Sequence, residues 1–336
     1  MNTNIRILLL LLPLTIACSK LPEETIVQKQ GMTFLNQNTK IINNTIYYLE
    51  DTHLSKIVIP SSESQMIATL PSTQYNDLIY DLDDQSVYYM QLVVSGYIQE
   101  YTVKTIQFSS PQTISTLYKT QTVIYDLAVN DESVFLLELM KNRITKVDRT
   151  TAISEEIVSD LSTMNQVYSI AADNDYVYYV NNKNWLNRYN IKTKKTTGMC
   201  QVGEFPGGVS SMRLCNGSLL VPQKDYLLSV DISADSTLPA ILFQGSYSLI
   251  GESDLYLNGK NIFLLKYADY TGNYNTSTLR KYISHIYAMD PAGSTPRLIK
   301  SFYQEHGYYL EGFYGIVEDA SNYYVATAQD IITIKK

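Results

Sequence analysis

The segment Asp175-Tyr176-Val177-Tyr178-Tyr179-Val180 decides the fold, because its pattern returns along the whole chain. Each copy has a polar turn, then a β-branched or aliphatic residue, an aromatic residue or Leu, and further apolar residues. A repeat of forty-odd residues made of short strands is typical of a β-propeller. The anchor positions are Tyr47, Tyr88, Phe135, Tyr178, Leu220, Phe263 and Tyr323, and the steps between them are 41, 47, 43, 42, 43 and 60 residues.

The residues around this segment outline a complete blade. Residues 167–172 and 176–180 are apolar strands, 186–191 alternate apolar and polar residues, and 195–200 form the outermost strand. Short polar turns rich in Asp and Asn separate them, as in an antiparallel meander. The other repeats follow the same order. We therefore predict an all-β fold, a seven-bladed β-propeller of four-stranded antiparallel blades.

The last repeat ends on a third strand, residues 331–334. An unpaired edge strand is a liability that proteins usually cover. We therefore expect the N-terminal strand to close the ring by completing the last blade, with residues 25–30 or alternatively residues 32–35 as the added strand. We expect the repeated Tyr positions, part of 29 Tyr in all, to pack between blades with their hydroxyls at the edge.

The N-terminal residues have the features of an export signal. Arg6 precedes an apolar run at residues 7–16, which is too short to span a bilayer. The sequence Leu14-Thr15-Ile16-Ala17-Cys18 resembles a bacterial lipoprotein signal, and this resemblance implies acylation of Cys18. The alternative is an ordinary secretory signal that ends near a Cys. We predict a signal peptide at 1–17, a tether at 18–24 and the propeller at 25–336.

The predicted location is the cell envelope, outside the cytoplasm, where the N-terminal lipid would hold the protein at the membrane. Ser19 follows the Cys where an inner-membrane retention signal has Asp, so we expect the outer membrane if the organism has one. The net charge is −7 with no cluster of Lys or Arg, and this argues against a nucleic-acid partner. No second apolar run is long enough to cross a membrane.

Few residues offer catalytic or metal-binding chemistry. We expect His53 and His285 to start the third strands of the first and sixth blades and His306 to lie in the loop before the last blade. The three His lack metal-type spacing. Acidic pairs follow the first strands of successive blades, where Ca²⁺ ligation and simple turn formation are the two interpretations. These acidic residues are Asp81, Asp83, Asp84, Asp131, Glu132, Asp173 and Asp175. We predict no catalytic residue, no cofactor and no metal.

The two Cys after the signal are Cys200 and Cys215. The repeat places Cys200 in the outermost strand of the fourth blade and Cys215 at the end of the innermost strand of the fifth. An exported pair can form a disulfide, but a disulfide needs Cα atoms within about 7 Å. A disulfide and two buried free thiols both remain open.

The sixth repeat is longer than the others. Its insert, residues 267–278, lies between the second and third strands, and the next connection, residues 304–313, is also long and aromatic. In a propeller both connections emerge on the same face. Long loops rich in Tyr, Asn, Ser and Gly are typical of binding surfaces. We predict partner binding by Tyr267, Tyr270, Tyr274, Tyr308, Tyr309 and Phe313, the alternative being an insertion without a partner.

The stretches Val177–Val180 and Leu186–Asn190 resemble bacterial propellers of the NHL, YncE-like and YWTD-like kind. The resemblance spans residues 25–336 and rests on a degenerate repeat, so it implies the fold and little about function. The predicted function is a membrane-anchored extracytoplasmic binding or scaffold protein that recognises a protein, peptide or glycan through its loop face. The alternative is an exported lyase or hydrolase with its site at the channel mouth.

Overall fold

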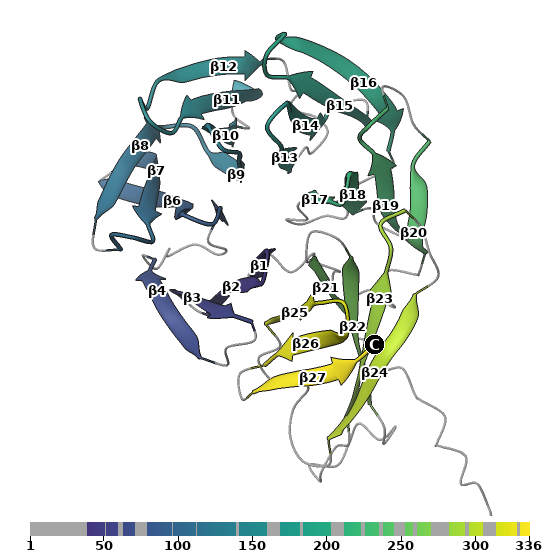
Figure 1. Cartoon of the computed structure of the whole chain (residues 1–336). Coiled ribbons are helices and arrows are strands. Elements are labelled where there is room, and N and C mark those ends of the chain that lie inside the picture. Colours follow the sequence, from purple (N-terminus) through teal and green to yellow (C-terminus); the bar gives the residue numbers. More distant parts are fainter. Residues whose placement is uncertain are drawn as a thin grey trace, which may run out of the picture.

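The computed structural model of the chain is a β-propeller, in which seven antiparallel sheets surround a common centre (Figure 1). Six sheets have four strands each and are here called blades 1 to 6, in chain order; the last is here called the three-stranded sheet. In every sheet the strands follow one another in sequence order. The structure describes residues 39–50, 52–59, 63–70, 79–95, 97–111, 113–138, 141–159, 169–181, 184–202, 212–222, 226–234, 238–244, 253–257, 261–269, 282–292, 296–304, 314–327 and 330–336.

Each blade runs from an innermost strand at the centre to an outermost strand at the rim. Blade 1 contains β1 (Thr39–Ile42), β2 (Thr45–Glu50), β3 (His53–Val58) and β4 (Ser64–Thr69). Blade 2 contains β5 (Tyr80–Leu82), β6 (Ser86–Ser95), β7 (Ile98–Gln107) and β8 (Ile114–Thr120). Blade 3 contains β9 (Ile124–Val129), β10 (Ser133–Glu138), β11 (Arg143–Asp148) and β12 (Ser154–Val158).

The second half of the ring follows the same order. Blade 4 contains β13 (Ile170–Ala172), β14 (Tyr176–Val180), β15 (Trp185–Asn190) and β16 (Lys195–Gln201). Blade 5 contains β17 (Arg213–Cys215), β18 (Ser218–Pro222), β19 (Tyr226–Asp231) and β20 (Ala240–Gln244). Blade 6 contains β21 (Ser253–Leu257), β22 (Ile262–Asp269), β23 (Tyr282–Met289) and β24 (Arg297–Gln304). The three-stranded sheet contains β25 (Gly315–Glu318), β26 (Asn322–Ala326) and β27 (Ile331–Lys335).

The expectation of seven four-stranded blades closed by an N-terminal strand is wrong. There are six four-stranded blades, and in the described part of the chain no fourth strand pairs with β27. Side-chain packing joins the last sheet to blade 1 instead. Val317 and Ala326 share a buried cluster with Ile46 of blade 1, and the rings of Tyr48 and Tyr314 stack with their centroids 3.8 Å apart.

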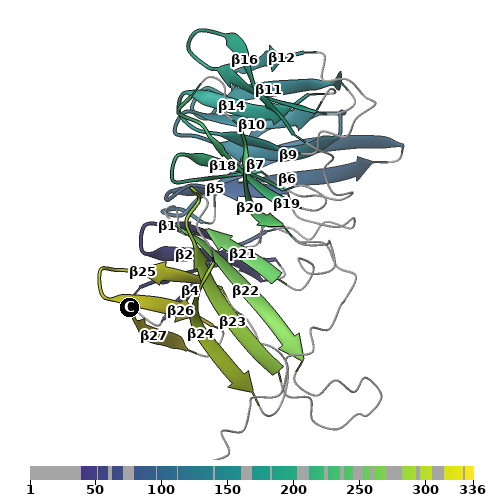
Figure 2. The same cartoon turned by 90° about the vertical axis from the view of Figure 1, so that its right-hand side faces the viewer.

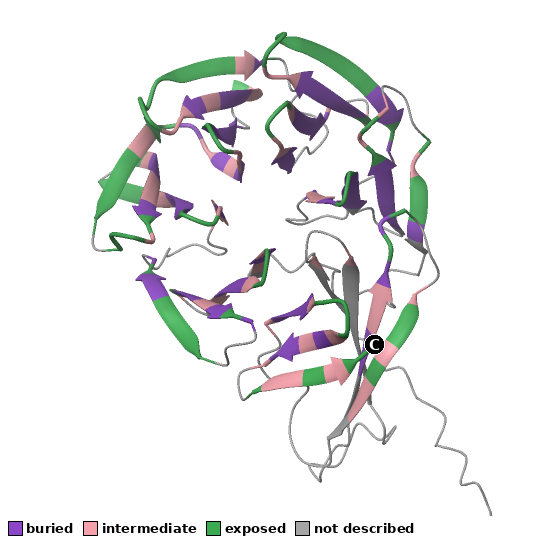
Figure 3. Ribbon diagram, in the orientation of Figure 1, coloured by how far each residue is buried: buried purple, intermediate pink, exposed green. Residues whose placement is uncertain are grey.

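The core is divided among the spaces between neighbouring sheets. Figure 3 shows the strands near the centre mostly buried and the outermost strands of blades 1 to 4 largely exposed. A separate cluster of buried apolar side chains fills each space between consecutive sheets around the ring. The largest buried side chains include Tyr89, Tyr178 and Phe135, each at most 1% exposed. The prediction that the repeated aromatic positions pack between blades is therefore confirmed for these residues, whereas the hydroxyl expected at the edge is itself buried in Tyr89.

The tight turns explain why the chain reverses where it does. Asn43, Asn142, Asn184 and Asn216 all have positive φ, which Asn tolerates better than most residues. Asn216 and Gly217, at φ 47° and 75°, form a two-residue turn between β17 and β18. Two successive residues with positive φ match the twist of a hairpin, and Asn-Gly is the preferred pair. The turns at Asn43 and Asn216 join the innermost strand of a blade to the second, and those at Asn142 and Asn184 join the second strand to the third.

Candidate functional site

The ring has two faces, which the strand order defines. The turns that join first to second and third to fourth strands lie on one face, here called the turn face. The connections that join second to third strands and one blade to the next lie on the other, here called the loop face. Figure 2 shows the ring from the side, with β6 and β22 both pointing toward the loop face on the right. Function was predicted for the loop face, and the acidic turns lie on the turn face.

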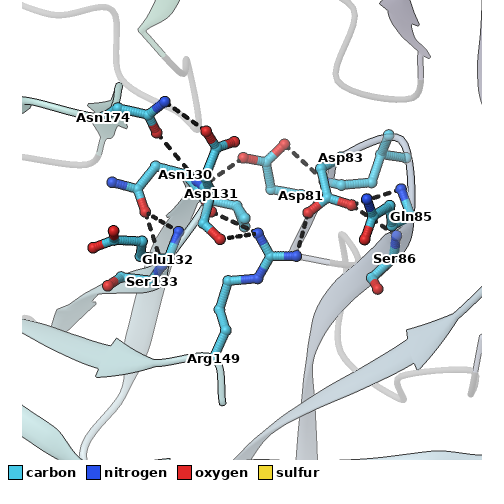
Figure 4. Close-up of polar contacts among 12 residues, drawn as sticks. Asp81, Asp83, Gln85, Ser86, Asn130, Asp131, Glu132, Ser133, Arg149 and Asn174 are labelled. Atoms are coloured by element: carbon cyan, nitrogen blue, oxygen red, sulfur yellow. Dashed lines mark hydrogen bonds and ion pairs between the residues drawn. The ribbon is translucent and has the colours of Figure 1, made fainter.

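Arg149 joins blades 2 and 3 on the turn face (Figure 4). It follows β11, and its Nη2 atom donates a hydrogen bond to Oδ2 of Asp83 over 2.5 Å. Its Nη1 atom donates to the carbonyl oxygens of Asn130 and Asp131, at 2.8 and 2.9 Å. The Arg149 guanidinium also lies over the ring of Tyr88, 4.8 Å from its centroid. One cation thus satisfies a carboxylate and two turn carbonyls.

The acidic residues of these turns are used as turn caps. Oδ1 of Asp83 accepts hydrogen bonds from the backbone N–H groups of Gln85 and Ser86, at 2.8 and 2.7 Å. Asp173 caps the corresponding turn of blade 4 in the same way, through the N–H groups of Asp175 and Tyr176. This is the usual reason for Asp in such turns. The turn interpretation of these residues is supported, whereas the described residues contain no group of three or more His, Cys, Asp or Glu placed to hold a metal ion.

Blades 3 and 4 are also joined on this face. Nδ2 of Asn130 donates to the carbonyl oxygen of Asp173 over 2.9 Å. Nδ2 of Asn174 donates to Oδ2 of Asp131 over 2.6 Å, and the N–H of Asp131 donates back to Oδ1 of Asn174. Figure 4 shows these groups pointing toward one another in a single network. The turn face of blades 2 to 4 is therefore engaged in internal polar contacts.

Hydrogen bonds to side-chain oxygens link the innermost strands of neighbouring blades. Most of the donors are backbone N–H groups of the next blade. Oδ2 of Asp81 accepts from the N–H of Val129, and Oδ1 accepts from Nζ of Lys40 over 2.5 Å. Oδ2 of Asp126 accepts from the N–H of Ile170 over 2.9 Å. Oγ of Ser169 accepts from the N–H of Met212 over 2.7 Å. These contacts join each pair of consecutive blades from blade 1 to blade 5.

Asp126 is the most perturbed of these carboxyl groups. Burial raises its pKa to about 6, although the positive charge of Arg213 and hydrogen bonds to the carboxylate act in the opposite direction. A raised carboxyl pKa is a feature of many catalytic groups. Both oxygens of Asp126, however, already accept backbone N–H groups, from Leu127 and Ile170. The arrangement serves to hold β9 against β13.

The two described histidines lie in different blades. His53 is the first residue of β3, as predicted, and is exposed in blade 1. His285 was expected at the start of its strand, but it lies in the middle of β23 and is 6% exposed. The difference arises because β22 and β23 are extended, with pairing that continues to Asp269 and Tyr282. Nδ1 of His285 is 2.8 Å from Oγ of Ser301, and His306 lies outside the described residues.

Of the six predicted binding residues, only Tyr267 belongs to the part of the chain that the structure describes. The backbone of Tyr267 lies in β22, opposite Ser284 of β23. The first three residues of the predicted insert, 267–269, thus belong to the second strand of blade 6, and residues 270–278 lie outside the described residues. The other five residues, Tyr270, Tyr274, Tyr308, Tyr309 and Phe313, lie outside the described residues, as does Cys18. Their roles stay predictions.

The loop face carries a second long hairpin that the sequence analysis missed. Strands β6 and β7 have ten residues each and pair from Ser86–Gln107 to Ser95–Ile98. The end of this hairpin bears four exposed apolar side chains, here called the apolar tip: Val93, Val94, Tyr97 and Ile98, with exposures of 42, 53, 107 and 58%. The signal was available in the 47-residue step between Tyr88 and Phe135 and in the unbroken run Leu92-Val93-Val94.

Cys200 lies in the outermost strand of blade 4 and Cys215 ends the innermost strand of blade 5, as predicted. Both are buried free thiols. Burial raises the pKa of both, and that of Cys215 to about 12, with a further contribution from the negative charge of Asp290. A thiol of high pKa is a poor nucleophile at neutral pH. Neither Cys therefore has the properties of a catalytic residue.

Comparison with solved structures agrees with the fold. The chain is similar to a structure described as the nidogen/laminin complex, with 12% identity and a TM-score of 0.50 over 78% of this chain and 92% of that chain. It also aligns with an oligogalacturonate lyase in complex with manganese, with 8% identity and a TM-score of 0.49 over 68% of this chain and 73% of that chain. Likeness at such identities shows a β-propeller fold alone. Neither a protein-family model nor a curated protein sequence matches the chain.

Proposed function

We propose that this chain is a lipid-anchored, extracytoplasmic binding propeller that holds a protein, peptide or glycan partner on its loop face. The observation that carries the proposal is the difference between the two faces. On the turn face of blades 2 to 4, Asp83, Asn130 and Arg149 are engaged in contacts between neighbouring blades. On the loop face, the hairpins β6–β7 and β22–β23 are the longest of the described residues.

Further support comes from the kind of surface and from the comparison. Functional residues of rigid scaffolds concentrate on their longer loops. The predicted binding residues of blade 6 and of the connection after it are aromatic, and such side chains bury large areas at low entropic cost. A propeller of this fold is found in a complex of nidogen with laminin. Protein binding is thus a use to which this fold is put.

The anchor is proposed at Cys18, where the apolar run ends at Ala17-Cys18. In the described ranges no helix is long and apolar enough to cross a bilayer, and a lipid group would hold the chain at a membrane without one. Metabolic labelling with a palmitate analogue should mark the wild-type chain and not Cys18→Ser. Equal labelling of the two would contradict the anchor and leave the binding proposal standing.

The binding surface is tested by site-specific photocrosslinking in the producing cells. A photoreactive Phe analogue placed at position 274 is expected to give a defined adduct, since Tyr274 belongs to the proposed surface. The same analogue at Ile153, a 69% exposed residue of the turn face, is the matched control. A variant in which a short Gly-Ser turn replaces residues 270–281 keeps β22 and β23. This variant should no longer bind the partner that the crosslink at position 274 identifies. Adducts formed only from position 153 would place the site on the turn face.

A further inference from the structure

We propose that the apolar tip of the β6–β7 hairpin enters the interface of a lipid bilayer and forms a second membrane contact of this protein. The tip presents Val93, Val94, Tyr97 and Ile98 to solvent. No charged residue occurs between Met90 and Gln99. Exposed apolar side chains that occur singly are common, but a contiguous group marks a surface for a partner or a membrane.

The position of the tip relative to the N-terminal segment favours the membrane. β1 leads into the turn at Asn43 and Asn44, just as β5 leads into the turn at Asp83, so both strands begin on the loop face. Thr39, where β1 begins, therefore lies on the same face as the tip. Thr39 comes 21 positions after Cys18, and a chain of this length reaches at most about 70–75 Å when extended.

The backbone pairing limits how deeply the tip can enter. Within the hairpin, pairing continues to Ser95 and Ile98. On its outer edges, β6 is bonded to the innermost-strand side as far as Met90, whose N–H donates to the carbonyl oxygen of Ile79, and β8 pairs with β7 only from Tyr101 onward. Among the described residues, the outer edges of the hairpin end are therefore not covered by neighbouring strands. Unpaired backbone groups are costly in hydrocarbon, so we place the tip at the level of the lipid headgroups, where Tyr is favoured.

The charges around the tip indicate which lipids suffice. Glu100, which lies opposite Val93 at the base of the tip, forms an ion pair with Lys119 over 3.0 Å, so the two charges compensate each other. The whole chain has a net charge of −7 and no basic cluster. Attraction to anionic lipids, which requires grouped Lys or Arg, therefore has no source here. The contact is apolar, and zwitterionic lipid is sufficient for it.

The test uses residues 18–336 with Cys18→Ser, so that no acyl group contributes. Co-flotation with phosphatidylcholine vesicles is measured for this chain and for the double variant Val94→Asp/Tyr97→Asp. The variant should bind at least about tenfold more weakly, because two charges replace apolar side chains at the interface. Ile153→Asp, on the turn face, is the control and should bind like the parent. Equal melting temperatures show that the variants are folded.

A second measurement reports the depth. Tyr97→Trp should give a blue-shifted emission and quenching by brominated lipid, while the emission of Trp185, a residue of blade 4, stays constant in the parent. Equal flotation of the double variant and the control would overturn the proposal. Loss of binding to a membrane protein without loss of binding to protein-free vesicles would also overturn it and assign the tip to a protein partner. The inference rests on the proposed lipid anchor, because the anchor determines which face of the ring is turned to the membrane. The test uses a chain without the acyl group at Cys18, so the anchor and the membrane contact of the tip can be disproved independently.

Discussion

The guanidinium of Arg149 and the carboxylate of Asp83 lie 2.5 Å apart, although 66 residues separate them in the sequence. The first follows the third strand of blade 3, and the second follows the innermost strand of blade 2. The side chains are only 16 and 24% exposed. The contact fastens two neighbouring blades at their turns.

Replacing Arg149 by Ala should destabilise the propeller by about 1–3 kcal/mol, since a partly buried carboxylate and two turn carbonyls lose their charged donor. Arg149→Lys should recover only part of this, because a single ammonium cannot reproduce the fork of donors. Urea unfolding gives the difference. Lys192→Ala is the control: its pair with Asp175 is largely exposed and should contribute well under about 1 kcal/mol. Equal effects of the two Ala variants would contradict a structural role for Arg149.

The sequence was sufficient for the propeller because its signal is periodic. Val177, Tyr178 and Tyr179 have equivalent residues at buried positions in other repeats. In each repeat the polar turn just before these positions contains Asp, Asn, Gly or Lys. Such repetition determines the order and pairing of strands. It does not determine how the ring closes. Closure depends on whether Val317 and Ala326 can pack against blade 1. This depends on the shapes of side chains that lie near opposite ends of the sequence.

The candidate surfaces were less predictable. The acidic turns were recognised, but the partner of Asp83 was not, because a contact between blades 2 and 3 has no local pattern. The apolar tip was missed since four to six extra residues in a repeat are easily absorbed by a loop. In the structure these residues lengthen β6 and β7 instead, and so carry Tyr97 away from the ring. A run of apolar residues that ignores strand alternation, as at Leu92 to Val94, was the usable sign.

The buried ion pair of blade 3 provides a second prediction. Glu138 is fully buried; burial tends to raise its pKa, but hydrogen bonds from Arg143, Thr145 and Thr120 and the charge of Arg143 hold the pKa below its usual value. Arg143→Ala should therefore destabilise the protein by about 3–5 kcal/mol at neutral pH, because an uncompensated charge stays buried. The loss should shrink as the pH falls and Glu138 takes up a proton. Thermal unfolding between pH 5 and 8 measures this.

The double variant Arg143→Ala/Glu138→Gln separates the charge from the packing. It should be more stable at pH 7 than Arg143→Ala alone, since no charge is left in the interior. Lys119→Ala, which breaks the exposed pair with Glu100, should change stability little and without a marked dependence on pH. If the two Arg143 variants unfold together at every pH, the contribution of Arg143 is packing and not charge.

The two thiols predict a chemical behaviour. Cys200 and Cys215 are buried, and their raised pKa values keep them protonated at pH 8. A thiol reagent such as Ellman's reagent should therefore react slowly with the folded mature chain carrying Cys18→Ser and should titrate two thiols after unfolding in guanidinium. Finding no thiol in the unfolded, unreduced chain would show a disulfide and contradict the free pair. Cys215→Ala is the control, with one thiol expected.

Asp126 predicts a dependence of stability on pH. Burial raises its pKa to about 6 in the folded chain, whereas the unfolded value is near 3.9. The folded state thus binds more protons between these values, and the contribution of Asp126 to stability falls as the pH rises from 4 to 6 and then levels off. Relative to Asp126→Asn, the wild-type free energy of unfolding should decrease by roughly 2–3 kcal/mol between pH 4 and 7. Urea unfolding of both chains at each pH gives the difference.

Asp148 supplies a control of opposite sign. Hydrogen bonds from the backbone and side chain of Thr151 and the N–H of Thr150 hold the pKa of this exposed carboxyl below its usual value. Its contribution is therefore present above the unfolded pKa and is lost as the pH falls, so the wild type should gain on Asp148→Asn with rising pH. Differences that run in the same direction for the two variants would show that Asp126 is not held protonated by burial, and its two bonds to Leu127 and Ile170 would then favour the carboxylate.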